Sequence, residues 1–149
     1  MKRLLGFVVL VGLGCAFAHA ELQNSTPVAN STIKALPRTV TLTFSEAVEV
    51  RLSTFKVYRL EAPPESWGSP TRLRRLAQPL VNRVLTLKTD TGAAARVDSG
   101  ILNTERTSKT IRFAALKPGL KAGAYVVMWR NLAVDGHTET GFFVFVYAP

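Results

Sequence analysis

Apolar and polar residues alternate over much of the chain beyond its first twenty positions. Val40, Leu42 and Phe44 are separated by threonines, which is the period of a strand with one buried face. Similar short runs, bounded by proline and glycine, occupy residues 55–60, 84–88, 111–114 and 125–130. The last run, residues 142–147, is apolar throughout and predicts a strand covered on both faces. We find no helical stripe, so strands are the only elements predicted.

These strands predict an all-β domain. The chain of 149 residues is long enough for one domain, or for one domain and a removable segment. Short strands separated by turns favour two antiparallel sheets packed as a sandwich. Leu120, Gly123 and Tyr125 lead into a predicted strand in the arrangement of the tyrosine corner of immunoglobulin-like sandwiches. The expected fold is therefore an antiparallel β-sandwich.

Residues 61–109 are the least regular part of the sequence. Prolines and glycines interrupt this region, and Arg72, Arg74 and Arg75 form a basic cluster near Trp67. We interpret the region as a long connection that carries one hairpin strand at residues 84–88. A run of positive charge is most often a solvated surface, although a lipid headgroup, a polysaccharide or a nucleic acid would also suit it. Export from the cytoplasm, predicted below, argues against a nucleic acid.

The N-terminus has the pattern of a secretory signal peptide. Lys2 and Arg3 precede an uninterrupted apolar run from Leu4 to Ala18 that ends in small residues. This run has 15 residues, whereas a membrane-crossing helix needs about 20. Residues 1–18 are therefore predicted to be a cleaved signal peptide, and residues 19–149 a single exported domain.

Two cleavage sites are compatible with the small residues at the end of this segment. Cleavage after Ala18 makes His19 the first residue of the mature protein, whereas cleavage after Ala20 makes Glu21 the first residue. The spacing of small residues does not choose between them. The choice matters because only the first cut gives a histidine with a free amine.

Composition excludes several kinds of chemistry. The sequence has one cysteine, two methionines and two histidines, too few for a disulfide framework, a cysteine-rich zinc site or an all-histidine metal cage. Cys15 follows Leu13 and Gly14 as in a lipoprotein signal, but Gly12 stands where such signals have leucine. The formal net charge is +9, and 47% hydrophobic residues are enough for a packed core.

Asp135 and His137 are the clearest candidates for chemistry. They flank Gly136 in a turn-prone stretch, and side chains two positions apart on extended backbone point the same way. By itself, such a pair is most often an ordinary hydrogen-bonded loop pair. If His19 is the mature N-terminus, its free amine and its imidazole add two nitrogens to the ligands of this pair. A planar set of three nitrogens and one oxygen is what Cu(II) prefers among first-row ions.

The sequence also resembles the CopC family of periplasmic copper-resistance proteins. Two blocks, residues 19–60 and 110–147, carry the resemblance, and the region between them has no counterpart that we can place. The matching residues are His19, Leu22, Ser25-Thr26-Pro27, Leu36-Pro37 and Val40-Thr41-Leu42-Thr43-Phe44-Ser45-Glu46 in the first block, and Leu120-Lys121-Ala122-Gly123-Ala124-Tyr125, Trp129-Arg130, Asp135-Gly136-His137, Gly141 and Phe145 in the second.

The resemblance implies an immunoglobulin-like, Greek-key β-sandwich in the periplasm that binds one Cu(II) per chain. The family's copper ligands, an N-terminal histidine, an aspartate and a second histidine, correspond to His19, Asp135 and His137. Glu46 corresponds to a carboxylate near the copper and is expected to be a weak ligand or to support the ligands. The resemblance further implies a monomeric copper carrier or chaperone rather than an enzyme. Its expected partner is a CopD-like inner-membrane copper transport protein, and no nucleic acid is expected.

The sequence gives less support to four alternatives. Some CopC proteins carry a methionine-rich Cu(I) segment, but the exported domain keeps only Met128, so a thioether site is not expected. Copper-dependent polysaccharide monooxygenases also use a terminal histidine on a sandwich, but an aspartate ligand favours Cu(II) and opposes the reduction that they need. A metal-free interaction module would follow from cleavage after Ala20. A hydrolase lacks support, because the sequence has no Gly-x-Ser-x-Gly motif.

Overall fold

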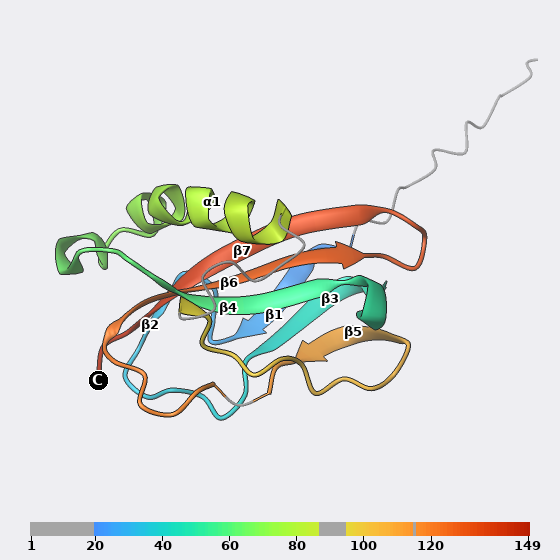
Figure 1. Ribbon diagram of the computed structural model, residues 1–149, viewed down its shortest axis with the longest axis horizontal. Helices are drawn as coiled ribbons and strands as arrows, with labels where there is room; N and C mark the ends of the chain where they lie inside the picture. The colour runs from blue at the N-terminus through green and yellow to red at the C-terminus, as the bar shows by residue number, and fades with distance from the viewer. Residues whose placement is uncertain (1–19, 87–94, 115) are drawn as a thin grey trace, which may run out of the picture.

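The computed structural model describes residues 20–86, 95–114 and 116–149, which form two β-sheets and one α-helix (Figure 1). The predicted signal peptide and His19 lie outside the described residues. In chain order the elements are β1 Leu22–Thr26, β2 Thr32–Ile33, β3 Thr41–Glu49, the 3-10 turn η1 Val50–Leu52, β4 Thr54–Leu60, the 3-10 turn η2 Pro64–Ser66, α1 Pro70–Thr86, β5 Thr107–Arg112, β6 Gly123–Leu132 and β7 Thr138–Tyr147.

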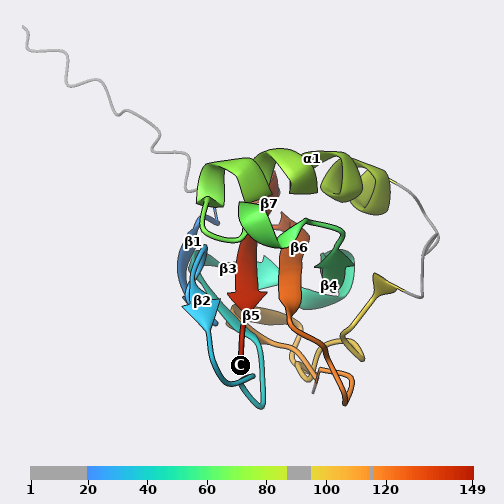
Figure 2. The same cartoon turned by 90° about the vertical axis from the view of Figure 1, so that its left-hand side faces the viewer.

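The two sheets and the helix form three layers. One sheet has the strand order β1-β3-β5, and the other has the order β2-β7-β6-β4. Every strand pair is antiparallel except β2 with β7, which is parallel. The helix α1 lies across the outer face of the four-stranded sheet (Figures 1 and 2). The predicted all-β sandwich is confirmed, with one helical layer added to it.

The central strands β6 and β7 are apolar on both faces over residues 124–129 and 142–146, because both faces are covered there. In β7, residues 143–146 are all buried, so the continuous apolar run correctly predicted a strand covered on both sides. Met128 of β6 is fully buried under the helix, where its thioether is a packing group. Alternate residues of β6 enter one core or the other: Tyr125, Val127 and Trp129 enter the core between the sheets, and Ala124, Val126 and Met128 enter the core under α1.

Aromatic rings fill the core between the sheets. The ring of Phe44 meets the indole of Trp129 edge-on, with centroids 5.7 Å apart, and Tyr125 stacks on Phe145 at 5.4 Å. Such contacts add stability beyond the burial of apolar area. Gly141 on β7 is the register partner of Trp129 on β6. A Cβ at position 141 would lie 2.4 Å from Cζ2 of Trp129, so the indole occupies the space that a side chain would need.

Tyr125 forms the predicted tyrosine corner. Its hydroxyl donates to the carbonyl of Lys121, four residues upstream, at 2.5 Å, and accepts an N–H of the Arg59 guanidinium at 3.1 Å. Burial raises the pKa of Tyr125 above its usual value, so the hydroxyl remains protonated and able to donate at neutral pH. The corner ties the start of β6 to the loop before it.

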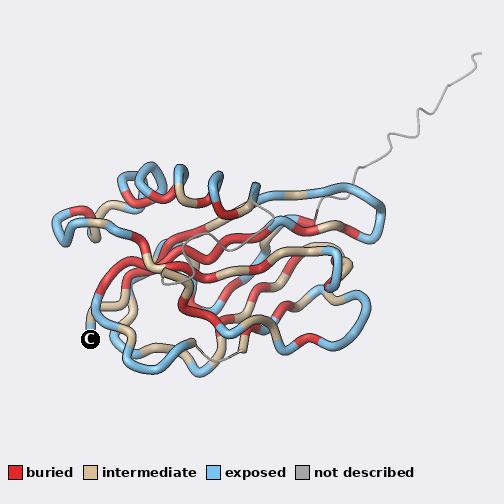
Figure 3. The backbone as a smooth tube through the Cα atoms, in the orientation of Figure 1, coloured by how far each residue is buried: buried red, intermediate tan, exposed pale blue. Residues whose placement is uncertain are grey.

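The helix α1 corrects our interpretation of the middle region. Residues 84–86 belong to this helix and not to a hairpin strand, while residues 87 and 88 of that predicted strand lie outside the described residues. The arginine cluster at residues 72–75 lies on the helix and not in a loop. Figure 3 shows one side of the helix buried against the sheet and the other side exposed. The buried positions recur at intervals of three or four, as on one helical face: Leu73, Ala77, Val81 and Val84.

Tertiary packing explains how this helix tolerates a proline in its interior. Pro79 lies on the exposed side, and an interior proline costs a helix about 3 kcal/mol. Burying one large apolar side chain contributes about 1.5–3 kcal/mol, so the three large buried residues of α1, Leu73, Val81 and Val84, offset that cost. Within the described part of the chain, no helix combines the length and the hydropathy that crossing a membrane requires.

The strand predictions differ from the structure most at the sheet edges. The predicted strand at residues 111–114 is observed as β5, which begins four residues earlier and ends at Arg112. Phe113 instead forms an isolated bridge with Ile101. The first half of β5 is polar because it lies at the edge of its sheet. The short edge strands β1 and β2 were not predicted.

Candidate metal centre

A tight turn joins β6 to β7 and carries two of the predicted ligands. The N–H of Ala133 donates to the carbonyl of His137 at 2.8 Å, and the N–H of Gly136 donates to the carbonyl of Ala133 at 2.9 Å. Gly136 has a φ of 91°, a left-handed conformation that favours glycine. The glycine therefore lets the chain reverse between Asp135 and His137.

Asp135 and His137 contact each other within this turn. One carboxylate oxygen of Asp135 accepts the backbone N–H of His137 at 3.0 Å, and the other lies 3.1 Å from Nδ1 of the imidazole. The His137 and Asp135 side chains are 45% and 34% exposed. A carboxylate beside Nδ1 fixes the orientation of the imidazole ring. The pair thus offers an imidazole nitrogen and carboxylate oxygens at an accessible turn.

The predicted carboxylate of Glu46 lies on the strand that runs beside this turn. The N–H of Val134 in the turn donates to the carbonyl of Ala47 on β3 at 3.1 Å. Glu46 precedes Ala47 and is partly exposed. Across residues 20–86, 95–114 and 116–149, no three His, Cys, Asp or Glu side chains gather closely enough to hold a metal ion. The structure therefore brings two of the predicted ligands together and does not join Glu46 to them.

The first described residue, Ala20, is anchored to the strand that leads into the turn. Ala20 is 1% exposed and belongs to the core between the sheets. Its carbonyl accepts an N–H of the Asn131 side chain at 3.3 Å. The next residue, Glu21, donates its N–H to the hydroxyl of Ser45 at 3.0 Å. The segment that follows His19 is thus attached both to β3 and to the end of β6 from which the turn emerges.

Sequence analysis did not single out Asn131. Its side chain is fully buried, and its Oδ1 has no hydrogen-bond partner in the described part of the chain. A buried polar atom without a partner is uncommon and costly. In the sequence, Asn131 is an amide within an apolar strand. This position does not show which distant segment the amide contacts.

Comparisons with known proteins agree with the predicted family. The family model of the CopC domain matches residues 22–78 and 75–148. Protein YobA from Escherichia coli strain K12 is 28% identical over 129 residues, and the match covers 87% of this chain and 78% of YobA.

Solved structures with this architecture include a CopC protein and PcoC. CopC from Methylosinus trichosporium OB3b has a TM-score of 0.57 and 22% identity, with 88% of this chain and 95% of that chain covered. PcoC, a copper resistance protein from Escherichia coli, has a TM-score of 0.55 and 26% identity, with 86% of this chain and 99% of that chain covered. Because the family model matches nearly all of the chain beyond residue 21, this protein belongs to the CopC family.

Proposed function

We propose that this protein is a periplasmic carrier of Cu(II) in copper resistance and that it holds one Cu(II) through His19, Asp135 and His137. The contact between Asp135 and His137 carries the proposal, because it presents an imidazole and a carboxylate at one turn. The structural likeness to PcoC, a copper resistance protein, supports the choice of metal. Glu46 is proposed as a carboxylate near the metal and not as a principal ligand.

The proposed donor set suits Cu(II). A terminal His19 supplies its amine and imidazole as a chelate, His137 supplies a third nitrogen, and Asp135 supplies an oxygen. Among first-row divalent ions, Cu(II) binds such donors most tightly and accepts a planar arrangement. The negative charge of Asp135 stabilises Cu(II) relative to Cu(I), which favours storage or transport over redox catalysis.

The burial of Ala20 supports cleavage before His19. Cleavage after Ala20 would remove a residue of the main core and would also remove the acceptor of the Asn131 side chain. Leaving a buried polar group without its partner costs about 1–3 kcal/mol. Cleavage after Ala18 keeps this contact and leaves His19 as the residue directly before an anchored one.

A copper carrier must pass its copper to another protein. The exposed turn leaves Asp135 and His137 accessible to another protein. We take that protein to be a CopD-like inner-membrane copper transport protein and the carrier to be a monomer. Pull-down of the membrane protein should then weaken when the turn is altered.

The proposal is tested on mature protein that begins at His19. After removal of metal by a chelator, titration should show one Cu(II) bound per chain, and electron paramagnetic resonance should show a tetragonal site with three nitrogen ligands. A matched protein that begins at Glu21 should lose this signal. Two or fewer nitrogens in the protein that begins at His19, or no stoichiometric binding, would contradict the proposed ligand set.

Replacing Asp135 by alanine should raise the reduction potential of the bound copper. The change removes a negative charge that stabilises Cu(II) more than Cu(I), so Cu(II) binding weakens more than Cu(I) binding. Each tenfold difference corresponds to about 59 mV for a one-electron couple. Voltammetry measures the shift, with Glu65→Ala, an exposed site in η2, as the control. Equal potentials in Asp135→Ala and the wild type would remove Asp135 from the ligands, and reductant-dependent oxidation of a polysaccharide would favour the enzyme alternative.

A further inference from the structure

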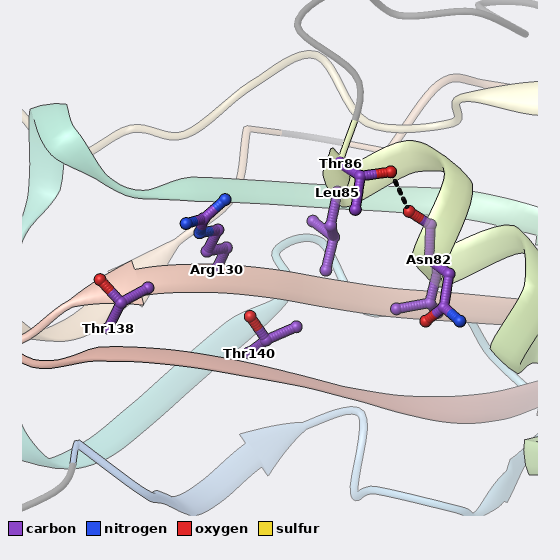
Figure 4. Close-up of a pocket in the computed structure, with 7 residues that line it drawn as sticks. Asn82, Leu85, Thr86, Arg130, Thr138 and Thr140 are labelled. Atoms are coloured by element: carbon purple, nitrogen blue, oxygen red, sulfur yellow. Dashed lines mark hydrogen bonds between the residues drawn. The ribbon is translucent and has the colours of Figure 1, made fainter.

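A hollow opens where β6 and β7 extend beyond the C-terminal end of α1. The last turn of the helix, with Leu85, forms one wall, and Arg130, Thr138 and Thr140 form the floor (Figure 4). Its volume is about 330 Å³, at the lower end of the range for small-molecule sites. A second hollow shares Leu85, Arg130 and Thr138 with the first and extends it past Thr54 on β4.

Arg130 lies between hydroxyl-bearing residues on both neighbouring strands. Its register partners are Thr54 on β4 and Thr140 on β7, so these three side chains project from one face of the sheet as a row. Thr138, two positions from Thr140, lies on the same face. The floor therefore combines the five N–H donors of a guanidinium with three hydroxyl groups.

Among the described residues, no negative charge offsets the positive charge of Arg130 in this hollow. None of the described residues that line either hollow is acidic, and in the described part of the chain the Arg130 guanidinium has no hydrogen-bond or ion-pair partner. Arg74 on α1 differs, because it donates to the carbonyl of Phe142 at 3.3 Å and lies 4.7 Å over its ring. An arginine in a concave site without a carboxylate is placed to bind an anion from solution.

We propose that this hollow binds a phosphate group. A phosphate presents oxygen acceptors in several directions, so it can use the fork of Arg130 and the threonine hydroxyls on either side at once. A carboxylate, with two oxygens in one plane, would leave some of these donors unused. The apolar wall formed by Leu85 leaves room for the ester chain of a phospholipid headgroup as well as for free phosphate, and both sources share this chemistry.

The site is distinct from the proposed copper site, although Thr138 directly follows the proposed ligand His137. Arg130 and Asn131 are consecutive on β6, so their side chains project from opposite faces of the sheet. Asn131 contacts Ala20 in the core between the sheets, whereas Arg130 lies on the face that carries α1. Phosphate binding can therefore be measured on the chelator-treated protein, and its outcome does not depend on copper binding.

Two probes distinguish the sources of the phosphate. Inorganic phosphate is titrated at constant ionic strength while the amide resonances of Thr138 and Thr140 are followed by nuclear magnetic resonance. Phosphatidylcholine vesicles, with and without phosphatidic acid, are tested by co-sedimentation. The wild type should bind at least one probe saturably. Arg130→Gln should weaken this binding at least tenfold, whereas Arg75→Gln, an exposed helix residue that lines neither hollow, should change it less than twofold.

A further variant keeps the net charge. Thr140→Val removes one hydroxyl from the floor and should weaken binding several-fold, and it decides the question if Arg130→Gln fails to fold. Binding of neither probe by the wild type would overturn the proposal. So would unchanged affinity in a folded Arg130→Gln, or an equal loss in Arg75→Gln, because an equal loss would show attraction to net charge alone.

Discussion

One extra residue before His19 in the mature protein is expected to weaken Cu(II) binding at least about a hundredfold, or about 2.8 kcal/mol. The extension keeps both histidines and every side chain, but it converts the amine of His19 into an amide. An amide nitrogen offers a lone pair only after its proton is displaced, so the chelate ring formed by the amine and the imidazole of His19 is lost. Competition titration with a Cu(II) indicator measures the affinity.

The matched control adds one alanine after Pro149, at the opposite end of the chain. It changes mass and length equally and should leave the Cu(II) affinity unchanged. If the N-terminal extension also left the affinity unchanged, copper would be bound by side chains alone. The site would then have to be built from the Asp135–His137 pair and ligands other than the His19 amine.

Gly141→Ala is expected to destabilise the folded protein by about 3 kcal/mol, the upper end of the range for overpacking a core. The new Cβ would lie 2.4 Å from Cζ2 and 2.6 Å from Cε2 of Trp129. The indole cannot move away freely, because its ring packs against Phe44 at 5.7 Å and Phe143 at 6.4 Å between centroids. Urea unfolding measures the free energy.

Gly68→Ala is the matched control, because a Cβ there meets nothing within 4 Å. It should change the free energy of unfolding by less than about 0.5 kcal/mol. Combining Gly141→Ala with Trp129→Phe should recover part of the loss, since the smaller ring gives space to the methyl group. Equal stability of Gly141→Ala and Gly68→Ala would show that the indole is not held in place.

The strands were predictable because burial leaves a regular trace in the sequence. Residues 40–44 alternate since β3 has one face in the core, and residues 142–147 do not alternate since β7 is covered twice. The start of the edge strand β5 was predicted four residues too late, because the first residues of this strand are polar. A sequence pattern records what is buried, so it is weakest where a strand buries little.

The helix α1 was missed although its apolar spacing is present. Pro70 and Pro79 lie on either side of the arginine cluster, and from the sequence both prolines are expected to interrupt a helix. The alternation that starts at Val84 also fits a strand over so short a run. The helix is favoured over a strand because it buries the apolar outer face of the four-stranded sheet. The residues of that face lie far away in the sequence, so a local pattern does not include them.

The candidate site was also predictable only in part. The pair formed by Asp135 and His137 was predictable because both residues belong to one turn, where spacing determines which side chains meet. The contact between Ala20 and Asn131 was not, because 111 residues separate its partners. No local pattern specifies a hydrogen bond over that separation, so only the folded structure shows where the N-terminal segment attaches.

The same separation determines when the site can exist during synthesis. Ala20 is synthesised early, but the contact of its carbonyl waits for Asn131 in β6, and the turn with Asp135 and His137 follows later still. A domain generally folds as a unit. An incomplete chain that ends before β6 therefore has one half of the proposed ligand set and no attachment for it. Capture of copper by three nitrogens would thus report that translation and folding of the whole domain are complete.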